Sequence, residues 1–73
     1  MTGVAVLGDP VRASGYRLVG AQLLPATTAA EVRRQWRELP ADVGVVLLTP
    51  AAAEVLGPQA LGSAVVLTVV LPP

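Results

Sequence analysis

The chain has no cysteine, no histidine and no lysine among its 73 residues. Without cysteine it can form no disulfide and offers no thiolate to a metal ion. Without histidine it lacks the side chain that most often acts as a general base or metal ligand near neutral pH. Isoleucine, asparagine and phenylalanine are absent too, and aromatic residues make up only 3% of the chain. We therefore expect neither a metal site nor a bound cofactor.

Charge is also scarce. Charged residues amount to 14%, and five arginines balance five acidic residues to a net charge of zero. No basic stripe with interleaved aromatic residues runs along the chain, so we expect no nucleic-acid partner. No segment reaches the roughly 20 apolar residues that a membrane-spanning helix needs, and no basic stretch precedes the first apolar run. These absences predict a cytoplasmic protein without direct membrane insertion.

What the chain does have is apolar residues, at 53% of its length, and residues 1–73 predict a single small domain with a thin core. Four apolar runs predict short strands at residues 3–8, 21–24, 43–48 and 64–71. Consecutive apolar residues in runs such as VGVVLL are typical of strands that are buried on both faces.

Helix signals separate these runs. Asp9-Pro10 is an N-cap followed by a proline, and it predicts a helix that ends at Gly20. Thr49-Pro50 repeats the signal for a short helix, which Gly57-Pro58 is expected to stop. The capping box at residues 28–31 begins the clearest helix. The apolar face of that helix consists of Ala29, Val32, Trp36 and Leu39.

Strands that alternate with helices predict a small three-layer α/β/α domain with a four-stranded parallel sheet. Right-handed crossovers favour the strand order 2-1-3-4, as in flavodoxin and receiver domains. Ligands of such sheets bind at the carboxyl ends of the strands, where Asp9 and Thr49 fall.

The residues at that edge do not match known catalytic patterns. The segment GDPVRASG is neither a dinucleotide-binding fingerprint nor a phosphate-binding loop. A receiver domain needs an acidic pair, an aspartate after the third strand and a lysine, and the chain has Asp9 alone, Thr49 and no lysine. Ser14 and Ser63 have no histidine to activate them. We expect no catalytic residue in this chain and interpret Asp9 as a helix cap.

Gly15 lies within the first predicted helix, where glycine is unfavourable. It could let the helix pack closely on the sheet, together with Val11, Leu18 and Val19. Alternatively it could belong to a recognition surface whose outward residues are Arg12, Tyr16 and Arg17. We predict that Gly15 packs against the sheet, and the recognition surface is the alternative.

The opening stretch, VAVLGDPVRASGYRLVG, resembles that of the F subunit of the V-type and archaeal-type rotary ATPases. That family begins with an apolar strand, then G-D, a spacer and G-[FY]-R-L-x-G. The residues that match are Gly8, Asp9, Gly15, Tyr16, Arg17, Leu18 and Gly20. The segment DVGVVLLT, which ends at Thr49, is similar to the family's pattern before its third helix, and the closing strand with its prolines is similar as well.

The resemblance implies a non-catalytic component of the central stalk. Such a protein binds the coiled-coil shaft (the D subunit) and supports the coupling of ATP synthesis or hydrolysis to proton or sodium transport. The catalytic A and B subunits are further possible partners, and the location would be cytoplasmic, peripheral to a membrane complex. Family members usually continue into a C-terminal helix, and we expect this protein to be without it, since the sequence given ends at Pro73.

The last predicted strand carries apolar residues on both faces, and the first helix alone cannot cover the strands on its side. We expect an uncovered apolar patch that includes Val66 and Val70, to be covered by the shaft protein or, in the isolated protein, by a second copy. The alternative function is a stand-alone interaction or regulatory module with receiver-like topology.

Overall fold

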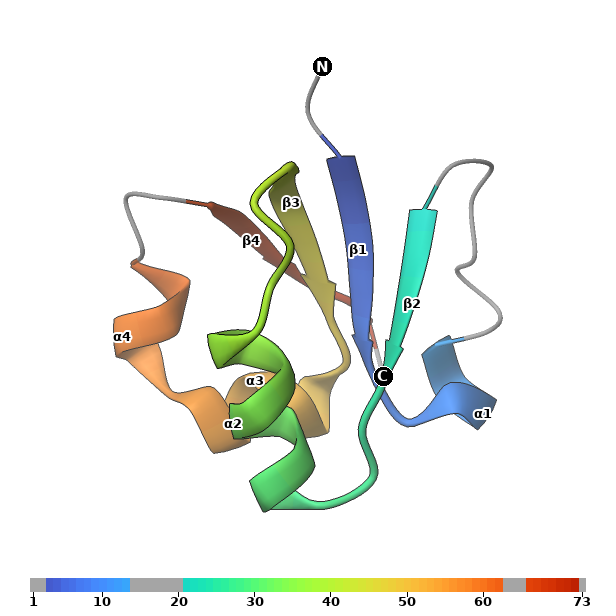
Figure 1. The fold of residues 1–73 in the computed structure, drawn as a ribbon. Helices are drawn as coiled ribbons and strands as arrows, with labels where there is room; N and C mark the ends of the chain where they lie inside the picture. The colour runs from blue at the N-terminus through green and yellow to red at the C-terminus, as the bar shows by residue number, and fades with distance from the viewer. Residues whose placement is uncertain (1–2, 14–20, 63–65, 73) are drawn as a thin grey trace.

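The computed structural model describes residues 3–13, 21–62 and 66–72 (Figure 1). Its sheet has four parallel strands, which are β1 (Gly3–Gly8), β2 (Ala21–Pro25), β3 (Val43–Leu48) and β4 (Leu67–Val70). They lie in the order β2-β1-β3-β4. The parallel sheet and its order are those that the sequence predicts.

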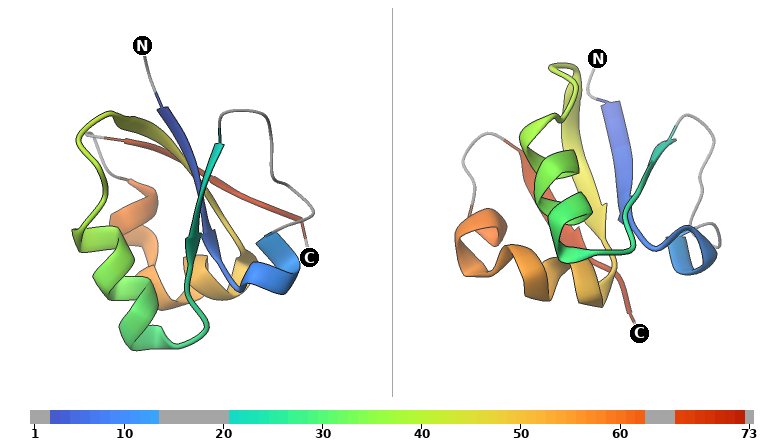
Figure 2. Two further views of the ribbon diagram at one scale, coloured as in Figure 1. Left: turned by 45° about the vertical axis from the view of Figure 1, so that its right-hand side comes forward. Right: turned by 60° about the horizontal axis from the view of Figure 1, so that its bottom comes forward.

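The helices lie on both faces of this sheet. Figures 1 and 2 show α2 (Ala29–Arg37), α3 (Pro50–Leu56) and α4 (Pro58–Leu61) on one side, which we call the covered face. The short helix α1 (Pro10–Ala13) lies on the other side, which we call the α1 face. The chain is thus a three-layer α/β/α domain, as expected.

The helix starts follow the predicted capping chemistry. The Thr28 hydroxyl accepts a hydrogen bond from the Glu31 N–H, and the Glu31 side chain accepts one from the Thr28 N–H, which completes the capping box of α2. The Thr49 hydroxyl accepts a hydrogen bond of 3.3 Å from the Ala52 N–H at the start of α3. Each cap satisfies a backbone donor that has no partner within its own helix.

The end of α3 is as expected, because the helix stops at Leu56 with Gly57 as its C-cap. Two other features differ from expectation. A further short helix, α4, was not predicted; it begins at Pro58 with Gly57 as its N-cap. The last strand, expected at residues 64–71, is shorter and comprises Leu67–Val70. The predicted continuation of the first helix falls on residues 14–20, which lie outside the described residues.

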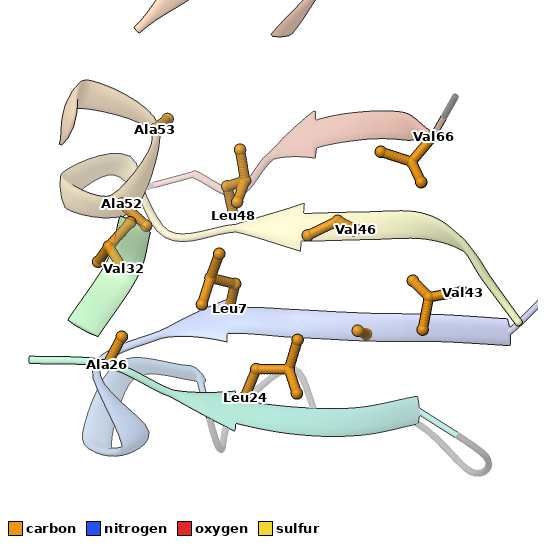
Figure 3. Close-up of a cluster of buried hydrophobic side chains, with 11 residues drawn as sticks. Leu7, Leu24, Ala26, Val32, Val43, Val46, Leu48, Ala52, Ala53 and Val66 are labelled. Carbon is orange, nitrogen blue, oxygen red and sulfur yellow. The ribbon is translucent and has the colours of Figure 1, made fainter. Parts of the chain in front are cut away.

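The larger core lies on the covered face (Figure 3). The strands contribute fully buried side chains, among them Leu7, Val46 and Leu48. The helices contribute smaller ones, Val32 from α2 and Ala52 and Ala53 from α3. Small residues allow α3 to pack close to the sheet. Partly buried residues surround this cluster, namely Trp36, Leu39, Val55 and Leu56.

Among the described residues, the core of the α1 face is smaller. Its described members are Val6, Ala13 and Leu71, with Ala21, Leu23 and Leu47 partly buried against them. Ala13 is the single buried residue of α1. Hydrophobic burial among the described residues is therefore concentrated on the opposite side of the sheet.

A bulge in β3 decides which of its residues reach the larger core. Gly3 is paired with Val43, but the next residue, Val4, is paired with Val45, so Gly44 is an extra residue in β3. The insertion changes the alternation of side chains, and both Val43 and Val46 join the covered-face cluster. A strand without the bulge would place residues three positions apart on opposite faces.

Candidate functional site

The carboxyl ends of the strands enclose a shallow pocket of about 150 Å³. Its walls come from the turn after β1, the segment that enters α2 and the start of α3. The residues that line it are Asp9, Arg12, Ala26, Thr27, Thr28, Ala29, Val32, Thr49, Ala51, Ala52 and Val55. This is the place where open parallel sheets usually bind ligands. The volume is below the roughly 300 Å³ at which ligand pockets for drug-sized molecules begin.

Two of the polar side chains that line this pocket, Asp9 and Thr49, cap helices. The Asp9 carboxylate accepts a hydrogen bond of 2.8 Å from the Val11 N–H, in agreement with our interpretation of Asp9 as a helix cap. Thr49 is only 3% exposed, and its hydroxyl caps α3. The geometry of both residues is accounted for by the start of the following helix.

Glu31 occupies the N-terminus of α2 with its own carboxylate. This side chain accepts hydrogen bonds from the Thr27 N–H at 2.9 Å, the Thr27 hydroxyl at 2.9 Å and the Thr28 N–H at 3.2 Å. The hydrogen bonds from Thr27 and then Thr28, with a smaller contribution from the charge of Arg34, lower the pKa of Glu31 below its ordinary value of 4.5. The positive end of α2 therefore holds an internal anion where an external one could bind.

Gly8 and Thr49 form a tight contact at the end of β1. Gly8 has a φ of +153°, a conformation that favours glycine. A Cβ at this position would collide with the Thr49 side chain. Hydrogen bonds also join the neighbouring strand ends, since the Ala26 N–H donates to the Gly8 carbonyl at 2.9 Å and the Thr49 N–H to the Leu7 carbonyl at 3.1 Å. The G-D pair of the opening motif thus has a structural explanation.

Within the described ranges, no three His, Cys, Asp or Glu residues come together in a group that could hold a metal ion. No helix in the same ranges has the length and hydropathy needed to cross a membrane.

The most exposed apolar surface of the sheet lies on the α1 face of β3 and β4. We call it the β3–β4 patch and define it by Val45, Leu47, Leu67 and Val69. Leu67 is 64% exposed and Val69 43% exposed, while Val45 and Leu47 are half-buried. Register pairs Val45 with Leu67 and Leu47 with Val69, so the four side chains share one face. Neither strand contains a charged residue.

The structure corrects the expectation that Val66 belongs to an uncovered surface. Val66 is 9% exposed and lies in the covered-face core, where Figure 3 shows its side chain near that of Val46. Val70 is 44% exposed, as expected, although its pairing with Leu48 places it on the covered face. The exposed apolar residues of β4 on the α1 face are Leu67 and Val69. The alternation of the sequence places Leu67 and Val69 on one face of β4 and Val66 and Val70 on the other. Which of these faces meets the helices depends on how β4 pairs with β3.

Of the other predicted partner-binding residues, one lies within the described part of the chain and two lie outside it. Arg12 is exposed on α1. Tyr16 and Arg17 lie outside the described residues, as do the motif residues Gly15, Leu18 and Gly20. The packing of Gly15 against the sheet therefore stays a prediction.

The fold and its surfaces define a class: a small α/β domain with receiver-like strand order and an uncharged apolar patch at one edge of its sheet. The family follows from comparison. The chain belongs to the ATP synthase (F/14-kDa) subunit family, whose model matches residues 4–71 and so includes parts of all four strands. Comparison with curated proteins gives no match. The family match confirms the resemblance that the opening motif carries and identifies the chain as a component of the rotary ATPase type.

Proposed function

We propose that this chain is a non-catalytic component of the central stalk of a V/A-type rotary ATPase. It binds the coiled-coil shaft (the D subunit) and supports the coupling of ATP turnover to proton or sodium transport. In this role it is peripheral to the membrane, on the cytoplasmic side. The observation that carries the proposal is the family match over residues 4–71.

The β3–β4 patch supports binding to a shaft. Leu67 and Val69 expose apolar surface on a strand that lies at the edge of the sheet. Soluble domains rarely keep a contiguous apolar patch uncovered, and edge strands without charge tend to pair with another chain. A coiled coil presents a long, mostly rigid surface whose apolar side chains could cover such a patch.

The test is binding to the coiled-coil shaft protein encoded in the same genome, measured by titration calorimetry. We expect Leu67→Asp and Val69→Asp to lower the affinity by at least about tenfold, because each would bury an unpaired charge in the contact. Their melting temperatures should stay near that of the wild type, since both side chains are already exposed.

Val11→Asp is the matched comparison. Val11 is 84% exposed on α1, next to Arg12, so the substitution places the same charge on the other candidate surface. We expect less than about a threefold effect on affinity. A loss for Val11→Asp but not for Leu67→Asp would move the contact to α1. A wild-type chain that fails to bind the shaft would contradict the proposed function.

We propose further that the chain itself turns over no ATP. The engaged state of Asp9 and Thr49 supports this, because both side chains already serve as helix caps. ATP hydrolysis by the purified chain that disappears in Asp9→Ala would contradict it.

A further inference from the structure

We draw no further inference here: the strongest candidate, the shallow pocket of about 150 Å³ at the carboxyl ends of the strands, carries none because its Asp9 and Thr49 side chains already cap helices and nothing among the described residues shows what would occupy it.

Discussion

The two faces of the sheet are built from similarly apolar strands, but the described residues bury them to different degrees. On the covered face, Leu7, Val46 and Leu48 are fully buried beneath α2 and α3. On the α1 face, Val6 is buried to the same degree, while Leu67 and Val69, farther along the sheet, are 64% and 43% exposed. The edge strand β4 is partly exposed on the covered face too, since Val70 is 44% exposed there, so the contrast between the faces is clearest at β3.

This difference in burial implies that different side chains serve stability and recognition. Side chains without solvent contact contribute most of the hydrophobic free energy, so the covered face should dominate folding. Exposed apolar side chains contribute little to folding but can gain area when a partner binds. Substitutions on the two faces should accordingly affect different measurements, and this expectation can be tested.

The largest effect is expected from truncating one leucine on each face. Leu48→Ala should lower the free energy of unfolding by about 2–5 kcal/mol, because it leaves a cavity in the larger core. Leu67→Ala should change it by less than about 0.5 kcal/mol. Urea denaturation followed by circular dichroism would measure both. Equal losses would mean that the α1 face carries as much of the stability as the covered face.

The next effect concerns Gly8, where the chain leaves the sheet for the α1 face. Gly8→Ala combines an unfavourable φ with a collision against Thr49, and we expect a loss of about 2–4 kcal/mol. Gly57 also has a positive φ, of +78°, but nothing lies within 4 Å of its missing Cβ. Gly57→Ala should therefore cost only about 1–2 kcal/mol, from strain. Thermal unfolding of both variants gives the ranking, and a reversed order would exclude crowding at Gly8.

A smaller effect separates the helix caps of the two faces. Thr28→Ala breaks the capping box of α2 and should cost about 1 kcal/mol, whereas Thr28→Ser should retain most of it. Asp9→Ala removes one capping hydrogen bond from the much shorter α1 and should cost about 0.5 kcal/mol. Chemical denaturation would compare the three variants. A larger loss for Asp9→Ala would mean that α1 matters more to folding than its burial indicates.

The smallest effect is a pH dependence that originates at α2. The folded chain lowers the pKa of Glu31, so its contribution to stability is complete above the ordinary value of 4.5 and is lost as the pH falls through the lower, folded value. Glu31→Gln should be less stable than the wild type at pH 7, and this difference should shrink as the pH falls below 4.5. Thr27→Ala removes the hydroxyl that donates to the Glu31 carboxylate. In that background the stability lost on Glu31→Gln should be smaller at pH 7. Melting curves between pH 3 and 7 provide the test, and a difference that is constant with pH would contradict it.

Local signals predicted much of this fold. The strands at residues 3–8 and 43–48 and the caps at Asp9, Thr28 and Thr49 lie where the sequence places them. These features depend on residues within a few positions of one another, so the sequence shows them directly.

Features that depend on pairing between distant segments were not predictable in the same way. The bulge at Gly44 and the face of Val66 follow from the register of β3 with its neighbours. Alternation divides Leu67 and Val69 from Val66 and Val70, but only the completed sheet shows which pair meets the helices. The small pocket and the engaged caps around it likewise required the three strand ends to be brought together.

The interior position of β1 also has a consequence for synthesis of the chain. Val4 pairs with Ala21 on one side and with Val45 on the other. The second partner is made about 40 residues after β1, which at roughly 5–20 residues per second corresponds to a delay of about 2–8 s. Parallel pairing across such a separation also closes slowly. During this interval Ala5, Val6 and Leu7, all buried in the finished domain, belong to a strand with one edge unpaired, and the nascent chain is open to chaperones and to other chains.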